Sequence, residues 1–373
     1  MQYIKPLDSI RAFAVLLVII THWFPETHKL NIYTGIFNGV DIFFVLSGFL
    51  ITKILFENRE IAENAGTTKG QILKSFYTRR TLRIFPIYYL TILCLYIAGP
   101  ATGTDIRNSI GYFLSYTSNF YFFSAGHWDG MLSHLWSLSV EEQFYLLWPA
   151  LMLFIRKEFL LPAILLFIFS GYTAQLLMHD IPLNDILTFA CFDGFGFGAL
   201  IAWAFVYRPK LLPVFYKAGA WLAIIAVIFQ VLRVVNEFSP VFLPSRILTS
   251  VCTAWLITMI LLGLDKKFLP SRILLNNKAF LFLGKISYGI YLYHLILPNI
   301  TSDTLNSLNS RLPHSIYKYN TYLIIAENFI LLIALAFLSW KIIEQPLLKL
   351  KKRFKYQDGN TQPKLVSAFA KSE

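Results

Sequence analysis

Long apolar stretches alternate with short polar segments along almost the whole chain. Ten of these stretches are about as long as a helix needs to cross the roughly 30 Å hydrocarbon core of a bilayer. The polar segments between them are too short to fold by themselves. The pattern therefore predicts an all-α integral membrane fold with about ten transmembrane helices, at 7–24, 38–56, 81–98, 141–156, 159–178, 189–207, 214–233, 246–264, 280–299 and 322–344.

Two stretches depart from the simple pattern. The fourth expected span is short and begins with Glu141 and Glu142, which makes it the weakest of the ten. An aromatic run at 111–123 is too short to cross a bilayer, so we expect it to lie at the interface or to re-enter the membrane.

The basic residues are distributed unevenly between the loops. With ten spans and a cytosolic N-terminus, 27 of the 33 Lys and Arg fall on the cytosolic side, as expected because cytoplasmic loops retain positive charge. The sequence thus predicts a multi-pass protein of the cell inner membrane with both termini in the cytoplasm. We expect one transmembrane domain over residues 1–346 and a basic cytoplasmic tail without fixed structure over 347–373.

Composition narrows the function classes. Hydrophobic residues make up 56% of the chain and charged residues 14%, whereas charged residues are about a quarter of ordinary soluble domains. The net charge of +12 comes from basic residues between the spans, so membrane topology explains it better than a nucleic-acid partner. Cys94, Cys191 and Cys252 stand singly in apolar runs, so we expect neither a metal site nor a disulfide framework.

Ionisable residues inside membrane spans are costly and are therefore functional candidates. Arg11 and His22 are eleven residues apart on the first span, so they lie roughly 16 Å apart on nearly the same helix face. Arg80 and Arg83 begin the third span at the depth of Arg11, on the cytosolic side. These three arginines are the candidate cofactor-binding residues, because guanidinium groups pair bidentately with phosphate.

A second layer of ionisable side chains is expected near the outer face. It contains His22, Asp41, His134, Glu141, Glu142 and His294. Histidine titrates near neutral pH and can deprotonate a hydroxyl group, and a carboxylate can fix its tautomer. We therefore expect His22, Asp41 and Glu142 to be catalytic, with Asp41 or Glu142 orienting His22, and Glu141, His134 and His294 to be candidate acceptor-site residues.

The two layers together favour acyl transfer. A phosphate-rich nucleotide in the cytosol suits the arginines, and the extended arm of coenzyme A would bring a thioester near His22. Acyl-CoA, with acetyl-CoA as the conservative choice, is thus the expected co-substrate, and no metal is expected.

Six motifs, in order, are similar to those of acyltransferase family 3, over nearly the whole chain from Leu7 to about Pro346. The motifs are Leu7–Ala14 with Arg11-x10-His22, Gly39–Leu50, Arg80-x-x-Arg83 with Ile84–Pro86, Trp136–Tyr145, Ser287–His294 and Glu344–Pro346. The family consists of membrane proteins that O-acylate surface glycans and other acceptors with acyl-CoA. This chain departs from its longer members in having no hydrolase-like domain after the last span, so no relay through such a domain is expected.

The resemblance implies an acyltransferase of the class that transfers groups other than aminoacyl groups. It implies that His22 is the catalytic base and that Arg11, Arg80 and Arg83 serve the donor. The expected acceptor is a hydroxyl of a surface glycan or lipid-linked sugar met at the outer side. The lipid bilayer is the other expected partner, nucleic acid is not, and an oligomer is compatible with the sequence.

Other interpretations remain for several of these residues. Asp41 can cap the second span, Arg11 can pair with Asp8 or Glu344, and His22 can be a core histidine bonded to a backbone carbonyl. The alternative function is a proton-coupled transporter that uses the same histidines and carboxylates as a relay. A non-catalytic scaffold would leave the outer layer of ionisable residues without a role.

Overall fold

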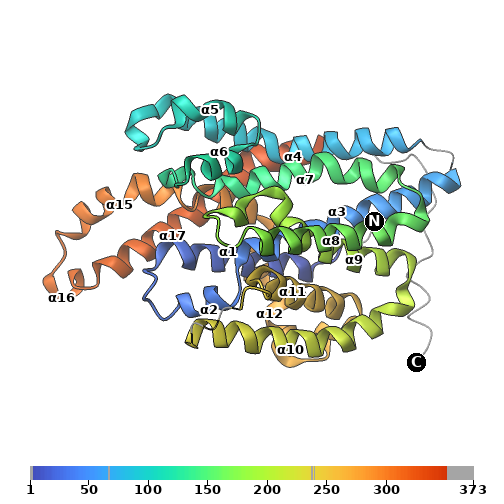
Figure 1. Cartoon of the computed structure of the whole chain (residues 1–373). Coiled ribbons are helices and arrows are strands. Elements are labelled where there is room, and N and C mark those ends of the chain that lie inside the picture. Colours follow the sequence, from blue (N-terminus) through green and yellow to red (C-terminus); the bar gives the residue numbers. More distant parts are fainter. Residues whose placement is uncertain (1–2, 66–67, 237, 239, 351–373) are drawn as a thin grey trace.

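The computed structural model describes residues 3–65, 68–236, 238 and 240–350, and every regular element in these ranges is helical. The long helices lie roughly side by side along one direction (Figure 1). Nine of them are α1 (Pro6–Trp23), α3 (Gly39–Ala65), α4 (Lys69–Ala98), α7 (Leu135–Phe154), α8 (Leu160–Leu177), α9 (Phe192–Tyr207), α10 (Leu212–Asn236), α11 (Ser245–Leu261) and α17 (Asn320–Ser339).

Shorter helices connect and extend the long ones. They are α2 (Asn31–Ile36), α5 (Ile106–Leu114), α6 (Ser118–Ala125), α12 (Leu269–Leu275), α13 (Lys278–Lys285), α14 (Ser287–Tyr293), α15 (Ile296–Asn309), α16 (His314–Tyr317) and α18 (Gln345–Leu350). The single-turn elements are η1 (Gly99–Thr102), η2 (Gly130–Leu132), η3 (Lys157–Phe159), η4 (Asn184–Ile186), η5 (Thr188–Cys191), η6 (Pro209–Leu211), η7 (Leu264–Lys266) and the π-helical η8 (Trp340–Glu344).

All ten predicted spans are mainly helical, but the helices differ in how well they suit a membrane. Seven helical segments are long and apolar enough to cross one; they contain α1, α3, α4, α8, α9, α10 and α17. The chain is thus a multi-pass membrane protein by length and composition. The ten-span count and the cytosolic position of both termini stay predictions.

The remaining three predicted spans depart from continuous apolar helices for identifiable reasons. Helix α7 carries Glu141 and Glu142 within its 20 residues. Helix α11 has only 17 residues. The ninth predicted span, 280–299, is broken into parts of α13, α14 and α15. The predicted tail at 347–373 begins within α18, and its residues 351–373 lie outside the described residues.

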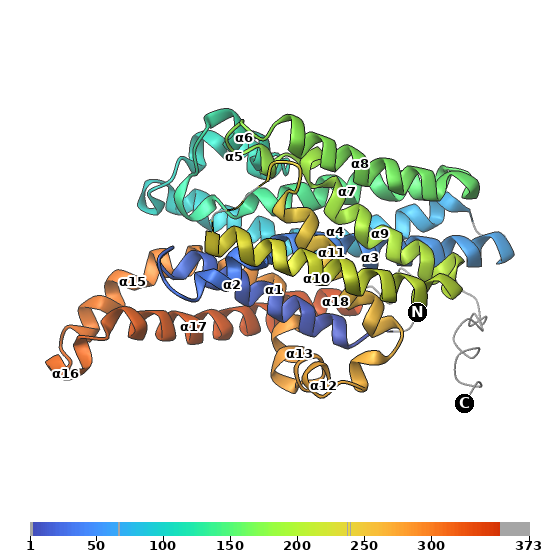
Figure 2. The same cartoon turned by 60° about the horizontal axis from the view of Figure 1, so that its bottom comes forward.

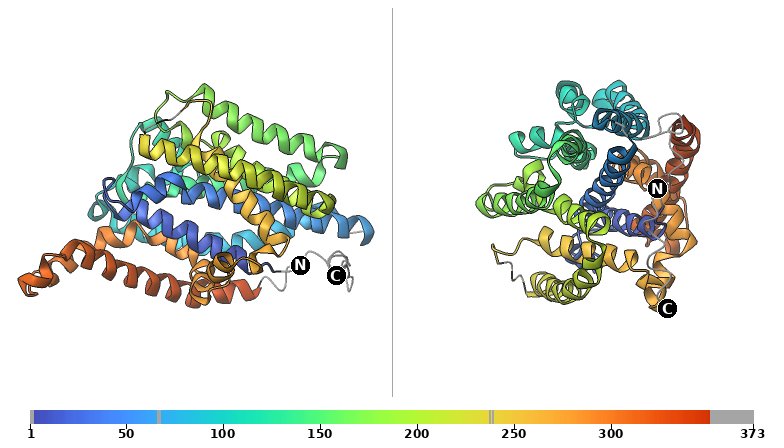
Figure 3. Two further views of the ribbon diagram at one scale, coloured as in Figure 1. Left: turned by 90° about the horizontal axis from the view of Figure 1, so that it is seen from below. Right: turned by 90° about the vertical axis from the view of Figure 1, so that its right-hand side faces the viewer.

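The helices form a buried inner set and a more exposed outer set. Helices α1, α3 and α9 are mostly buried, whereas only about a fifth of the residues in the apolar stretches of α8, α10 and α17 are buried. The end-on view in Figure 3 places α1 and α3, in blue, inside the bundle. Apolar side chains at the protein surface are unfavourable in water and favourable in lipid. We therefore infer that the outer set faces the bilayer.

One end of the molecule carries a projecting arm. Helices α15, α16 and the start of α17 extend beyond the other helices (Figures 1 and 2). Asn328 of α17 is buried and bonds Thr301 and Ser302 of α15 at 2.5 and 3.2 Å, which ties the two helices together. The start of α1 and the end of α17 lie toward the opposite end from this arm.

Small residues allow α3 and α9 to pack closely at the centre of the bundle. A Cβ atom on Gly198 would lie 2.0 Å from the Val45 carbonyl oxygen, and one on Gly48 would lie 2.0 Å from that of Phe195. Glycine at such contacts lets helix backbones approach, as in other membrane bundles. The glycine-rich segment 193–198 is therefore a packing surface and lies at the start of a helix without a preceding strand.

We expect Gly198→Ala to destabilise the protein by roughly 1–3 kcal/mol, because the added methyl group must displace backbone of α3. Thermal unfolding of the detergent-purified protein measures this change. Gly111→Ala is the matched control, since no heavy atom lies within 4 Å of its Cβ position and alanine favours the helix. Equal unfolding temperatures for the two variants would contradict the packing role of Gly198.

Candidate active site

A cavity of about 470 Å³ lies between α1, α3, α4, α7 and α14. Five of its lining residues are cationic: Arg11, Lys53, Arg79, Arg80 and Arg83. Three are acidic: Asp8, Glu141 and Glu142. The excess of positive charge in a partly apolar chamber favours an anionic ligand.

Helix α4 supplies most of the positive charge because its arginines repeat at helical spacing. Arg79, Arg80 and Arg83 all line the cavity, so Arg79 joins the two predicted donor residues of this helix. The predicted donor residues Arg11, Arg80 and Arg83 are thus brought together. Arg11 also pairs with Asp8 through Nη1 and Oδ1 at 2.6 Å, one of the two partners expected for it.

The two glutamates lie in the same cavity as the arginines. Ser47 of α3 donates a hydrogen bond to Glu141 Oε1 at 2.7 Å, and its hydroxyl lies 3.0 Å from that of Tyr145. The Arg80 guanidinium stacks over the Tyr145 ring at 4.1 Å. Since α7 begins at Leu135, Glu141 and Glu142 lie roughly 10 Å inside the helix start. Both line the arginine cavity from adjacent positions, so the catalytic candidate Glu142 and the acceptor-site candidate Glu141 lie in one chamber.

Ser137 and Tyr291 belong to the part of the cavity lining that is nearest to the histidines. Their hydroxyl groups are in hydrogen-bond contact, and both residues line the cavity. The Tyr291 hydroxyl also lies 3.1 Å from the His134 carbonyl oxygen. The ring of Tyr291 is next to those of His134 and His294, with centroids 5.7 and 5.3 Å away. This pair therefore stands between the cavity and the histidines, which do not line it.

Three histidines that are far apart in the sequence meet beside Tyr291. The ring centroid of His294 is 4.9 Å from that of His22 and 4.8 Å from that of His134. His134 and His294 are buried, whereas His22 is exposed. The described residues contain no group of three potential ligands arranged to hold a metal ion.

The break in the ninth predicted span brings His294 to this place. Helix α14 ends at Tyr293, and the chain turns at His294 before α15 begins. Trp23 Nε1, one residue after His22, donates to the His294 carbonyl oxygen at 2.7 Å. His134 Nε2 lies 3.0 Å from the Leu292 carbonyl oxygen. These bonds join α1, α14 and the residue preceding α7.

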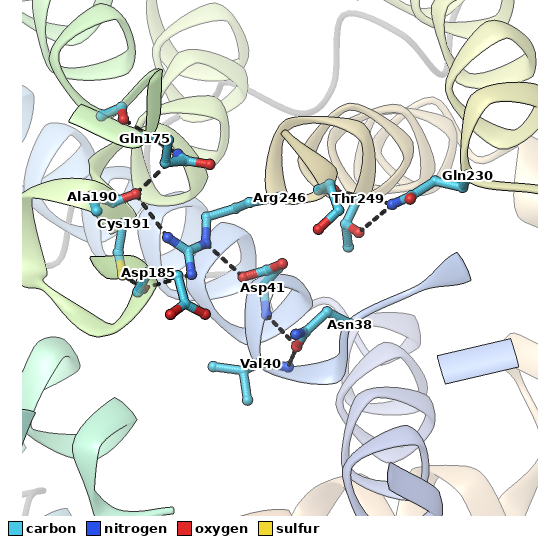
Figure 4. Close-up of polar contacts among 12 residues, drawn as sticks. Asn38, Val40, Asp41, Gln175, Asp185, Ala190, Cys191, Gln230, Arg246 and Thr249 are labelled. Atoms are coloured by element: carbon cyan, nitrogen blue, oxygen red, sulfur yellow. Dashed lines mark hydrogen bonds and ion pairs between the residues drawn. The ribbon is translucent and has the colours of Figure 1, made fainter. Parts of the chain in front are cut away.

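Asp41 has a different partner from the one its depth suggested. Its Oδ1 accepts a hydrogen bond from Arg246 Nε at 2.8 Å, and both side chains are buried (Figure 4). Arg246 also donates to the carbonyl oxygens of Ala190 and Asp185 at 2.7 and 2.8 Å. The described hydrogen bonds include none between Asp41 and His22. Arg246 is the second residue of α11 and lies 205 positions after Asp41, so no local spacing in the sequence predicts this pair.

The six predicted outer-layer residues therefore separate into three places. His22, His134 and His294 form one cluster, Glu141 and Glu142 line the arginine cavity, and Asp41 joins Arg246. The sequence missed Ser47, Tyr145 and Tyr291 as site residues. Each lies inside a motif already noted. Their hydroxyl groups are uncharged, so burial in a membrane does not mark them as functional candidates in the way that it marks ionisable residues.

The chain matches the family described as an acyltransferase domain, Acyl_transf_3, over residues 4–343. The chain belongs to acyltransferase family 3. This confirms the resemblance inferred from the six motifs.

Two relatives of this chain have names that include an activity. The peptidoglycan O-acetyltransferase OatA of Listeria monocytogenes is 30% identical over 93% of this chain and 56% of that protein. The Bacillus subtilis protein named "Putative peptidoglycan O-acetyltransferase YrhL" is 29% identical over 93% of this chain and 55% of its own length. This acyltransferase family 3 chain thus spans just over half the length of these relatives. No solved structure matches it.

We expect Arg246→Leu to destabilise this acyltransferase family 3 chain by roughly 3–5 kcal/mol, because it leaves the buried Asp41 carboxylate without its cation. Combining it with Asp41→Leu should recover part of the loss, since no charge then remains unpaired. Thermal unfolding of the purified variants tests both statements. Arg311→Leu, at an exposed position, is the control and should be neutral. A double variant no more stable than Arg246→Leu would contradict the pairing.

Proposed function

We propose that this chain is a membrane O-acyltransferase that moves an acyl group, most simply acetyl, from cytosolic acyl-CoA to a hydroxyl group of a glycan or lipid-linked sugar. The observation that carries the proposal is the arginine-lined cavity, because one of its lining residues, Tyr291, packs against His134 and His294 of the histidine cluster. Family membership and the names of the two relatives support acyl transfer, and those names favour a peptidoglycan-type acceptor.

The cavity suits the donor. Arg11, Arg79, Arg80 and Arg83 present planar guanidinium groups that pair with phosphate oxygens. We propose that the phosphates of acyl-CoA bind among them and that the acyl end points toward Tyr291. In this arrangement the cavity opens to the cytosol, the protein lies in the inner membrane with ten spans, and both termini are cytoplasmic.

His22 is the proposed general base. His22 is an exposed residue outside the cavity lining, so we propose that an acceptor hydroxyl approaches it without entering the cavity. Removal of the hydroxyl proton by the imidazole makes the acceptor oxygen nucleophilic toward the thioester carbonyl carbon. The new ester bond forms as the carbon–sulfur bond breaks, and coenzyme A leaves as the thiolate that takes up the proton.

The reaction requires passage between the two compartments of the site. Tyr291 lines the cavity, and its hydroxyl contacts Ser137 and the His134 carbonyl oxygen, while His22 does not line the cavity. We propose that Tyr291 moves when donor is bound, so that the thioester reaches His22. Substrate-induced movements that gate a site are common in enzymes.

Replacing Arg80 and Arg83 together by alanine should weaken acetyl-CoA binding by roughly 100-fold, because each charge-assisted hydrogen bond contributes about 1.5–3 kcal/mol. Equilibrium dialysis with labelled acetyl-CoA and detergent-purified protein measures this. Lys74→Ala, an exposed cation of α4 outside the cavity, is the control and should bind normally. A wild-type protein indifferent to acetyl-CoA would instead favour the proton-coupled transporter.

His22→Ala should reduce acyl transfer by roughly 10²–10⁴-fold, the usual contribution of a positioned general base. Acetyl-CoA binding should stay unchanged, because His22 does not line the cavity. Release of coenzyme A in the presence of muropeptide or lipid-linked sugar acceptors reports the transfer. The exposed His127 gives the matched control His127→Ala. Full acyl transfer by folded His22→Ala protein would refute the base assignment.

A further inference from the structure

The orientation of His22 depends on the groups that contact its ring nitrogen Nδ1. The two carboxylates first considered are engaged elsewhere, since Asp41 pairs with Arg246 and Glu142 lines the arginine cavity. Two atoms instead lie close to His22 Nδ1: the Val18 carbonyl oxygen at 2.8 Å and His294 Nε2 at 3.3 Å. The second contact joins residues 272 positions apart, so it is created by the fold alone.

The proton positions on His294 follow from its other nitrogen. His294 Nδ1 lies 2.6 Å from the Tyr291 carbonyl oxygen, and a carbonyl oxygen can only accept a hydrogen bond. Nδ1 must therefore carry the proton. In the neutral ring, Nε2 then has a free lone pair, and this lone pair faces His22.

The same reasoning fixes the proton on His22. Both neighbours of its Nδ1 are acceptors, namely the Val18 carbonyl oxygen and the His294 Nε2 lone pair. Only a protonated Nδ1 satisfies them, and one N–H group shared between two acceptors is a familiar arrangement. The basic lone pair of His22 is consequently on Nε2, the nitrogen that a general base must present to the acceptor hydroxyl.

His294 is held in place more firmly than a surface residue would be. Its side chain is fully buried, and its own carbonyl oxygen accepts the 2.7 Å bond from Trp23, the residue that follows His22. The ring of His134 packs edge-on against it with centroids 4.8 Å apart. The hydrogen bond from Trp23 to the His294 carbonyl therefore joins the same two chain segments that carry the two interacting imidazoles.

We propose that His294 is a positioning residue for His22. Its Nε2 lone pair keeps the His22 proton on Nδ1, sets the direction of Nε2, and accepts a stronger hydrogen bond when His22 becomes the imidazolium ion. A carboxylate performs this task in the well-known triads of hydrolases. Here a neutral imidazole does so, which avoids placing an additional buried negative charge beside the site. This inference rests on the proposed role of His22 as base.

Two amide substitutions separate positioning from simple support. In His294→Asn the side-chain amide replaces Nδ1, so the bond to the Tyr291 carbonyl can persist while the acceptor facing His22 is lost. In His294→Gln the amide reaches the place of Nε2, so its oxygen can still accept from His22 while the bond to Tyr291 is lost. Positioning therefore predicts that Gln is the better substitute, whereas a structural role predicts that Asn is.

We expect His294→Asn to lower kcat by roughly 10–100-fold, with the KM for acetyl-CoA unchanged, and His294→Gln to retain most of the wild-type kcat. Thermal unfolding of both variants separates activity loss from misfolding, and His127→Gln is the control. Equal kcat values for Asn, Gln and wild type, or a higher kcat for Asn than for Gln, would overturn the proposal.

A spectroscopic measurement tests the same inference without turnover. In protein labelled with ¹⁵N-histidine, the ring nitrogen shifts should place the proton on Nδ1 of both His22 and His294, with His22→Ala and His294→Gln providing the assignments. A wild-type His294 protonated on Nε2 would overturn the inference, because no acceptor would then face His22. If the tautomers are as expected but His22→Ala transfers acyl groups normally, the contact between the two histidines stands and the assignment of His22 as general base fails.

Discussion

The site depends on one constraint: backbone carbonyl groups need hydrogen-bond partners where a helix ends inside an apolar protein. Helix α14 ends at Tyr293, and the buried residues Tyr291, Leu292 and His294 around this break must find partners for their carbonyl groups within the protein. The carbonyl oxygens of residues 291, 292 and 294 instead contact His294 Nδ1, His134 Nε2 and Trp23 Nε1. These hydrogen bonds bring together segments from three parts of the chain, and each segment carries one of the three histidines.

Charge is distributed so that the cavity and the histidine cluster have different electrostatic character. The cavity has more cations than carboxylates, and several of these groups are already linked, through Arg11 with Asp8 and through Arg80 with Tyr145, Ser47 and Glu141. Asp41 pairs with Arg246, and neither residue lines the cavity. A polyanionic donor is thus favoured in one compartment, while the neutral imidazoles of the other can accept and release a proton.

Predictions from the sequence succeeded where one helix or one local spacing carries the information. The apolar lengths located the helices, and the spacing of Arg80 and Arg83 on one helix placed both in the same cavity. The motifs identified the family. Predictions of partners across helices were less successful. The sequence gives the depth of a residue in the membrane, but it does not give the rotation of the helix about its axis, which decides the neighbour that the side chain faces. Asp41 and His22 were paired by height, yet Asp41 points to α11.

By itself, the sequence determined that the chain is a multi-pass helical protein of acyltransferase family 3 and which polar residues lie within its helices, because hydrophobic length and local motifs are properties of single segments. Only the tertiary structure decided that His294 rather than a carboxylate touches His22, that Glu141 and Glu142 face the arginines, and that Tyr291 separates the two compartments. Those outcomes depend on how helices rotate and where one breaks, which is set by packing between segments distant in the chain.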